Sequence, residues 1–229
     1  MAGNDRRGAG FTPARLQEVY DRLLYAFGPR GWWPGDTPFE VMVGAVLTQN
    51  TAWANVEKAI ANLKAAGLLT PLGLDRVSLS RLAGLIKPSG YFNIKAARLK
   101  NLVALIVEAG GGDPPRLLAR PTDRLRRDLL TVKGIGPETA DSILLYAARR
   151  PVFVIDAYTR RILSRHGLAN GGETYDRLQA LFMDNLPPNT QRFNEYHALL
   201  VHLGKHFCKP RPLCQGCPLE GLNQPGGNI

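Results

Sequence analysis

The chain has 229 residues, enough for one large or two small hydrophobic cores. Its formal net charge of +10 and isoelectric point of about 9.9 favour a polyanionic partner, of which DNA is the simplest. The sequence holds no apolar run long enough for a membrane span and no secretory signal, so we expect a cytosolic protein.

The first half of the chain is a succession of helix signals, and the whole chain is predicted to be all-α. Residues 1–10 contain glycine and arginine and are expected to be disordered. Thr12 caps a first helix that ends near Gly28, and a loop with two adjacent tryptophans follows at residues 31–35. Further helices are expected from about Pro38, from a cap at Thr51 to Gly67, from a cap at Ser78 to Pro88, and from about Asn93 to Gly110, before a connector at residues 110–121.

The central motif begins at Thr122, a favourable helix N-cap. Leu125, Leu129 and Leu130 give the next helix an apolar face at helical spacing, and Gly134 should end it. The motif is predicted to be a helix that stops in a short hairpin.

Gly134 and Gly136 bracket Ile135 in that hairpin, where glycine can adopt positive φ without a Cβ penalty. Pro137 suits the first position of the following helix. Such a turn presents backbone N–H groups to an anion, and a phosphate fits there. An ordinary corner between two helices is the alternative interpretation.

A β-prone segment, Val152–Ile155, comes after the second helix of the hairpin. Asp156 ends this segment and is expected to begin the next helix. The remaining helices are predicted near residues 173–184 and 189–206. No internal repeat is visible.

The motif resembles that of the helix-hairpin-helix (HhH-GPD) DNA glycosylases of the endonuclease III superfamily. Their signature is a leucine, a Gly-x-Gly-x-x-Thr-Ala hairpin, and an apolar run that ends in a catalytic aspartate. Here it corresponds to Leu130, residues 133–140 and residues 154–156. The resemblance extends from Phe11 to Leu222, nearly the whole chain.

The resemblance implies a two-lobed, all-α, endonuclease III-like fold with the hairpin at the mouth of a cleft. Residues 31–150 would form one lobe, with the helix-hairpin-helix at 122–149. Residues 11–30 and 151–229 would form the second lobe, which ends in a cysteine loop at 206–224.

The resemblance also assigns the chemistry. Asp156 matches the catalytic aspartate, whose carboxylate stabilises the positive sugar and orients or deprotonates the attacking nucleophile; the alternative is a plain N-cap. Relatives that also nick the strand carry lysine at the fifth position of Gly-x-Gly-x-Lys, where this chain has Glu138. A carboxylate cannot form an imine, and Lys133 lies on the other side of the turn. This departure predicts a monofunctional glycosylase with weak or absent lyase activity.

The loop Trp32-Trp33-Pro34, together with Trp53, resembles the 3-methyladenine glycosylase branch, in which aromatic residues at these places sandwich the flipped base. Alkylation makes a purine cationic, so it stacks favourably on indole. Glu138 could complement that charge at the floor of the pocket. The alternative is that one or two of the tryptophans are core residues.

Flipping a base leaves a gap in the stack, and Gln49 and Tyr91 match the two wedge positions of the family. The alternatives are a polar residue at a helix end for Gln49 and a turn aromatic for Tyr91. The expected DNA contacts are Gln49, Asn50, Tyr91, Lys133, Gly134, Ile135, Gly136 and Thr139.

Cys208, Cys214 and Cys217 resemble the C-terminal iron–sulfur loop of the superfamily. A fourth cysteine would be expected where Asn223 stands. The first expectation is therefore a [4Fe–4S] cluster with one ligand missing. A zinc site on these thiols and His206, or no metal, remain alternatives.

The leading hypothesis is a monomeric, monofunctional DNA glycosylase of base excision repair that releases alkylated purines such as 3-methyladenine from double-stranded DNA, associated with the nucleoid if the source is bacterial. A glycosylase for oxidised or mismatched pyrimidines is the alternative enzyme. A non-catalytic binder of damaged DNA is the alternative from another class of protein.

Overall fold

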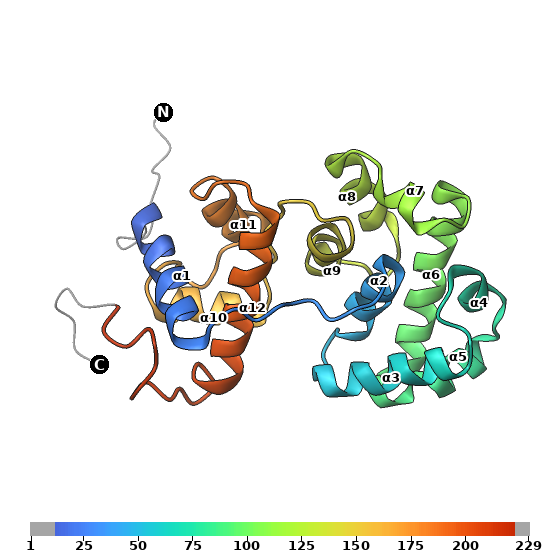
Figure 1. The fold of residues 1–229 in the computed structure, drawn as a ribbon, viewed down its shortest axis with the longest axis horizontal. Coiled ribbons are helices and arrows are strands. Elements are labelled where there is room, and N and C mark those ends of the chain that lie inside the picture. The colour runs from blue at the N-terminus through green and yellow to red at the C-terminus, as the bar shows by residue number, and fades with distance from the viewer. Residues whose placement is uncertain (1–11, 223–229) are drawn as a thin grey trace. The chain divides into compact units, whose positions relative to one another are not determined.

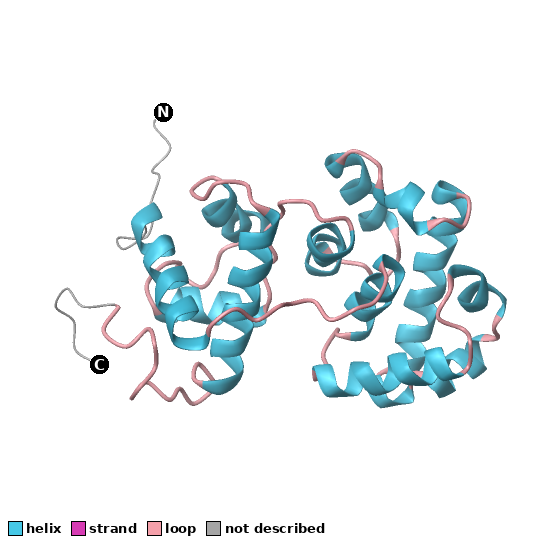
Figure 2. Ribbon diagram, viewed as in Figure 1, coloured by secondary structure: helices cyan, strands magenta, loops and turns pink. Residues whose placement is uncertain are grey.

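The computed structural model describes residues 12–222 of the chain. These residues form twelve α-helices, a 3-10 helix and a π-helix, and they contain no strand (Figure 2). The prediction of an all-α chain is confirmed. None of the described helices is both long and apolar enough to cross a membrane. The prediction for residues 1–10 and the position of Asn223 lie outside the described part of the chain.

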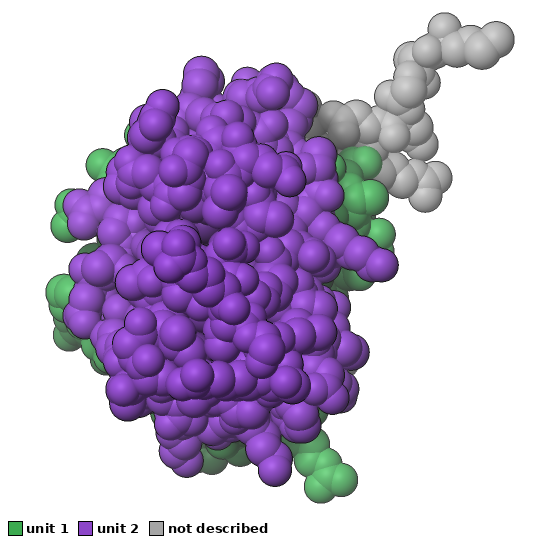
Figure 3. Space-filling model, turned by 90° about the vertical axis from the view of Figure 1, so that its right-hand side faces the viewer, with its two compact units in different colours: residues 1–32, 151–229 green, residues 33–150 purple. Residues whose placement is uncertain are grey.

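The chain divides into two compact units, which are coloured separately in Figure 3. Unit 1 comprises Met1–Trp32 and Pro151–Ile229, and unit 2 comprises Trp33–Arg150. Unit 1 therefore unites the first described helix with the last third of the described chain around a core of its own.

Unit 1 is built on its last helix (Figure 1). Its helices are α1 (Pro13–Phe27), α10 (Ala157–Arg165), α11 (Tyr175–Met183) and α12 (Thr190–His206). Helix α12 packs against α1 and α10. The core is aromatic: the Phe153 ring stacks on Phe182 with centroids 3.7 Å apart, and the buried Tyr196 hydroxyl donates to the Leu16 carbonyl over 2.8 Å.

In unit 2, the other helices are arranged around the long helix α6 (Figure 1). Its elements are α2 (Pro38–Leu47), α3 (Trp53–Ala65), α4 (Pro71–Arg76), α5 (Leu79–Leu85), the 3-10 helix η1 (Lys87–Ser89), α6 (Phe92–Gly110), α7 (Pro114–Leu118), α8 (Thr122–Thr131), α9 (Pro137–Ser142) and the π-helix η2 (Ile143–Ala147). Helix α6 contacts α2, α4, α5, α7, α8 and η1. Helices α2 and η2 are buried along most of their length, as their apolar sequences require.

Several predicted helix ends are confirmed because they depend on local hydrogen bonds. Thr12 caps α1 by accepting from the Arg15 N–H, and Ser78 caps α5 by accepting from the Arg81 N–H. Asp156 begins α10 in the same way.

Other local predictions were wrong. Thr122 is the first residue of α8, and its N-cap is Pro121. Ala52 rather than Thr51 is the N-cap of α3. The connector at 110–121 contains the short helix α7, and residues 152–155 are extended without pairing into a sheet. Short helices and unpaired extended segments depend on packing, which local propensity does not report.

Candidate functional site

The hairpin in unit 2 reverses the chain between α8 and α9. Gly134 adopts φ +96°, and the N–H of the buried Ile135 donates to the Val132 carbonyl over 3.0 Å. Gly136 caps α9 with φ −96° and ψ −179°, which is extended backbone. The expectation of positive φ therefore holds for Gly134 alone.

The two glycines are required for different reasons. A Cβ at Gly134 would overlap the Arg98 side chain, which lies across the turn. A Cβ at Gly136 would meet no protein atom within 4 Å. The start of α9 is thus exposed backbone, which another molecule can approach closely.

The second hairpin helix is anchored by an ion pair that the sequence did not reveal. Arg126 of α8 binds both carboxylate oxygens of the fully buried Asp141, with N–O distances of 2.7 and 3.1 Å. A paired, doubly hydrogen-bonded carboxylate is the form in which a buried charge is tolerated. This pair fixes α9 on α8 and leaves Lys133 and Glu138 exposed on either side of the turn.

Gln49, in the turn between α2 and α3, bonds to the hairpin. Its Nε2 donates to the Gly134 carbonyl over 3.1 Å and to Thr139 Oγ1 over 2.9 Å. Its Oε1 accepts from Arg98 Nη1. In this state the side chain predicted as a wedge belongs to a hydrogen-bond network with the hairpin, and Thr139 is buried under that network.

Asn50 and Tyr91 share an unusual backbone conformation. Asn50 has φ +54° and Tyr91 has φ +45°, in the left-handed region that non-glycine residues seldom adopt. Tyr91 precedes α6 and is 68% exposed, a large exposure for an aromatic side chain. Both residues stand on tight turns that present them to solvent.

The tryptophans are divided between the units. In unit 2, the Trp33 ring is 5.0 Å from the Trp53 ring at 84°, and 5.0 Å from Tyr146 of η2 at 42°. Gly44 of α2 makes room for Trp33, since a Cβ there would lie 3.1 Å from the indole. Tyr146 completes this aromatic cluster, and its place in an apolar run gave no sequence signal. Trp32 belongs to unit 1, where Lys205 Nζ lies 5.8 Å from its ring centroid.

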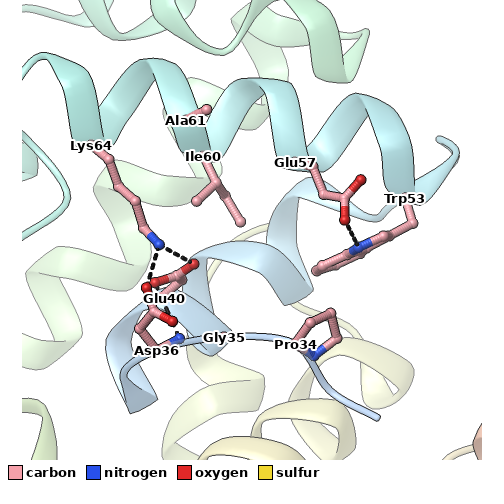
Figure 4. Close-up of a pocket in the computed structure, with 9 residues that line it drawn as sticks. All are labelled: Pro34, Gly35, Asp36, Glu40, Trp53, Glu57, Ile60, Ala61 and Lys64. Carbon is pink, nitrogen blue, oxygen red and sulfur yellow. Dashed lines mark hydrogen bonds and ion pairs between the residues drawn. The ribbon is translucent and has the colours of Figure 1, made fainter. Parts of the chain in front are cut away.

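A hollow of about 350 Å³ lies beside Trp53 (Figure 4). It is lined by Pro34, Gly35, Asp36, Glu40, Trp53, Glu57, Ile60, Ala61 and Lys64. Lys64 pairs with Asp36 over 2.7 Å and with Glu40 over 2.8 Å, and these hydrogen bonds raise the pKa of Lys64. Trp53 Nε1 donates to Glu57 over 2.8 Å. Three carboxylates face one ammonium group here, so the hollow is acidic in an otherwise basic chain. Glu138, predicted for the pocket floor, does not line it.

Asp156 in unit 1 follows a buried extended segment and is itself 9% exposed. Its Oδ1 accepts from the Thr159 N–H over 2.7 Å, and its Oδ2 lies 3.8 Å from Nε2 of His197 on α12. Burial lowers the pKa of His197, so the imidazole is neutral around pH 7. The N-cap hydrogen bond fixes the orientation of the carboxylate, so the N-cap and catalytic interpretations are compatible.

The three cysteines supply three of the four thiolates that a [4Fe–4S] cluster usually takes. Cys208 is buried and its Sγ accepts from Arg165 Nη1 over 3.4 Å, whereas Cys214 is exposed. Cys217 is half-buried, and this burial raises the pKa of its thiol. Within residues 12–222, no three histidine, cysteine, aspartate or glutamate side chains form a group that could hold a metal ion.

Two arginines of α10 donate hydrogen bonds to backbone carbonyls of this loop. Arg161 Nε donates to the Cys208 carbonyl over 2.7 Å, and Arg165 donates to the carbonyls of Lys209 and Pro210 over 2.5 and 2.8 Å. The iron–sulfur cluster and the zinc alternative stay predictions of the sequence.

The family model for the HhH-GPD superfamily base excision DNA repair protein matches residues 43–188. A protein of Methanocaldococcus jannaschii, named provisionally as a DNA repair glycosylase, is 46% identical over 206 residues, which are 90% of this chain and 94% of the relative. Endonuclease III of Thermotoga maritima is 31% identical over 209 residues, 90% of each chain.

Two solved structures share the fold. The Helicobacter pylori 3-methyladenine DNA glycosylase bound to 1,N6-ethenoadenine has a TM-score of 0.72 and 31% identity, and the match covers 85% of this chain and 97% of that one. A non-covalent endonuclease III–DNA complex has a TM-score of 0.79 at 23% identity, covering 93% and 95% of the two chains. The predicted endonuclease III-like fold is therefore confirmed.

Proposed function

Because the chain belongs to the HhH-GPD superfamily of base excision DNA repair proteins, we propose that it is a monofunctional glycosylase for alkylated purines. It removes the damaged base from double-stranded DNA and leaves an abasic site. The enzyme class comes from the family, whereas the lesion and the absence of strand cleavage are proposals that rest on its own residues.

Asp156 is proposed as the catalytic residue. Breaking the N-glycosidic bond builds positive charge on the sugar, and a carboxylate fixed beside the sugar stabilises that charge. The Thr159 N–H holds one oxygen of Asp156 over 2.7 Å, so the carboxylate enters the reaction already oriented. It can also accept the proton of the attacking water.

The proposal of a monofunctional enzyme rests on Glu138. Strand cleavage requires an amine that attacks the sugar and holds it as an imine. An exposed carboxylate occupies the first turn of α9, the place from which strand-nicking relatives would supply the amine. Lys133 lies before both glycines of the hairpin, on the other side of the turn.

The observation that supports an alkylated purine is the aromatic cluster of Trp33, Trp53 and Tyr146 beside the acidic hollow. A base methylated at N3 or N7 is cationic, so it gains from indole faces and from nearby carboxylates. It is also a good leaving group that requires little acid assistance. The 31% identity to a 3-methyladenine glycosylase agrees with this substrate.

The DNA contacts are proposed on the hairpin and the two tight turns of unit 2. Gly136 leaves the backbone open to a phosphate, and Lys133 adds a positive charge. Gln49 and Tyr91 are the proposed probes of the base stack once a base is flipped. Asn50 is exposed and completes this surface, whereas the side chains of Ile135 and Thr139, which were also predicted as contacts, are buried.

Oxidised or mismatched pyrimidines are the second candidate substrates. The 31% identity to endonuclease III of Thermotoga maritima favours them. Such bases are neutral, so the carboxylates of the acidic hollow stabilise them less than they stabilise a cationic purine.

The deciding experiment incubates the protein with methylated DNA and with duplexes that each carry one lesion, with and without alkali. Release of 3-methyladenine, with strand breaks that appear only after alkali, supports the proposal. Excision of an oxidised or mismatched pyrimidine without release of any methylpurine would assign the second candidate.

In the proposed chemistry the protein's part is carried by its own side chains, and water is the nucleophile. The [4Fe–4S] cluster is a separate prediction from the spacing of Cys208, Cys214 and Cys217. Iron and zinc analysis of the purified protein tests it.

A further inference from the structure

Lys95 is a buried cation that the proposed reaction does not use. It lies in the first turns of α6 and is 1% exposed. Its Nζ donates to the Leu47 carbonyl over 2.9 Å and to the Ser89 carbonyl over 2.6 Å. A lysine is seldom fully buried unless it is paired, and here both partners are backbone carbonyls.

Each of these carbonyls precedes one of the proposed DNA probes. Leu47 ends α2 two residues before Gln49, and Ser89 ends η1 two residues before Tyr91. These two peptide groups are 42 positions apart in sequence, and Lys95 binds both with one amine. Ser89 is itself fully buried.

The two turns need such support because their backbone is strained. Asn50, at φ +54°, and Tyr91, at φ +45°, adopt the left-handed conformation without being glycine. Such conformations persist only when the surrounding structure holds them, and they concentrate at functional sites. Lys95 holds the residues on which both turns begin.

Two further residues of α6, Arg98 and Asn101, reach the Gln49 turn and the hairpin. Arg98 donates to Gln49 and lies across Gly134, and the Asn101 amide donates to the Lys133 carbonyl over 3.0 Å. Residues spaced by three lie near one another along a helix. Helix α6 thus ties both probe turns and the hairpin together.

We propose that Lys95 is a positioning residue that holds the Gln49 and Tyr91 turns at a fixed separation for insertion into DNA. It touches neither the base nor the sugar, and it acts through the two turns. This inference rests on the proposed function, in which Gln49 and Tyr91 probe the base stack. Burial lowers the pKa of Lys95 to about 8, with Arg98 adding to the effect, so the amine is mainly protonated at neutral pH.

The test replaces the amine while keeping the length of the side chain, in Lys95→Met. Its matched control is Lys100→Met: Lys100 also lies on α6 and also donates to two carbonyls, those of Asp75 and Val77 over 2.6 and 2.5 Å. Lys100 therefore holds the C-terminal end of α4, which carries none of the proposed DNA contacts.

Three measurements separate positioning from general stability. They are single-turnover excision, the fluorescence of 2-aminopurine beside the lesion, which reports opening of the stack, and the affinity for undamaged duplex. Lys95→Met should lose about tenfold to a hundredfold in excision, as small misplacements do, and should lose the lesion-dependent fluorescence. Its affinity for undamaged duplex should be unchanged. Lys100→Met should match the wild type in all three measurements.

The single variants Gln49→Ala and Tyr91→Ala identify which proposal fails. If they are impaired while Lys95→Met behaves as wild type, the Lys95 inference is overturned and the probes stand. If they excise normally, the probe assignment is overturned, and the Lys95 inference is overturned with it. Equal losses in Lys95→Met and Lys100→Met would reduce Lys95 to a structural support and also overturn the inference.

A double-mutant cycle covers the case in which Lys95→Met loses its fold. Lys95→Gln retains one amide donor with a shorter reach, and thermal melting verifies folding. Its effect on excision should shrink when it is combined with Gln49→Ala and Tyr91→Ala, because residues that act through one another are not additive. Full additivity would contradict the inference.

Discussion

Asp156 is both the N-cap of α10 and the proposed catalytic residue, and two substitutions separate these roles. Asparagine is as good an N-cap as aspartate and can still accept from the Thr159 N–H, but it carries no charge. Asp156→Asn should therefore melt as the wild type does. Its excision rate should fall by about 10² to 10⁴, or about 3 to 5 kcal/mol of transition-state stabilisation.

Asp156→Ala removes the cap as well as the charge. The lost cap should cost about 1 kcal/mol, which lowers Tm by about 2 to 4 °C in a chain of this size. Thr174→Ala is the matched control, because Thr174 caps α11 of the same unit by accepting from the Arg177 N–H over 3.3 Å. It should lose similar stability and keep the excision rate.

Single-turnover release of 3-methyladenine from methylated DNA measures the excision rate, and thermal melting measures the stability. A correctly folded Asp156→Asn protein with a rate near the wild type would remove Asp156 from the chemistry. The non-catalytic binder of damaged DNA would then become the better interpretation.

Four further predictions concern residues of unit 2. Because Glu138 offers no amine, the wild type should excise the base and leave the strand whole until alkali is added. A denaturing gel should show no enzyme–DNA adduct after borohydride treatment, and efficient trapping would refute the monofunctional assignment. Gly134→Ala should cost at least about 1 kcal/mol of stability, since alanine is strained at φ +96° and overlaps Arg98, as chemical denaturation would measure. Gly136→Ala, which is unstrained and meets no protein atom, should cost less stability than Gly134→Ala and should weaken binding to all duplexes alike in a titration. A change in lesion preference alone would contradict a backbone contact. The free energy of unfolding of the wild type, relative to that of Lys95→Met, should rise between about pH 8 and pH 10.5. In this range the lysine is still protonated in the unfolded chain but has lost its proton in the folded protein. A difference that does not change with pH would mean that folding does not lower the pKa of Lys95.

The sequence by itself determined the all-α class, the order of the main helices and the hairpin motif. Its reliable signals were local. The caps at Thr12, Ser78 and Asp156 each form a hydrogen bond within three residues, so the pattern of side chains specifies them without reference to the fold. Gly134 is similar, because its positive φ belongs to the turn itself.

Only the tertiary structure decided how distant segments meet. The bond of Gln49 to the hairpin spans 85 residues or more, and Lys95 reaches a carbonyl 48 residues away. Leu130, on the predicted apolar face, is 36% exposed, since the packing of α8 buries Leu125 and Leu129 instead. No pattern of neighbouring residues shows that a lysine will be buried. The burial of Lys95 depends on two carbonyls at the ends of α2 and η1, and these carbonyls come together only when unit 2 is packed around α6.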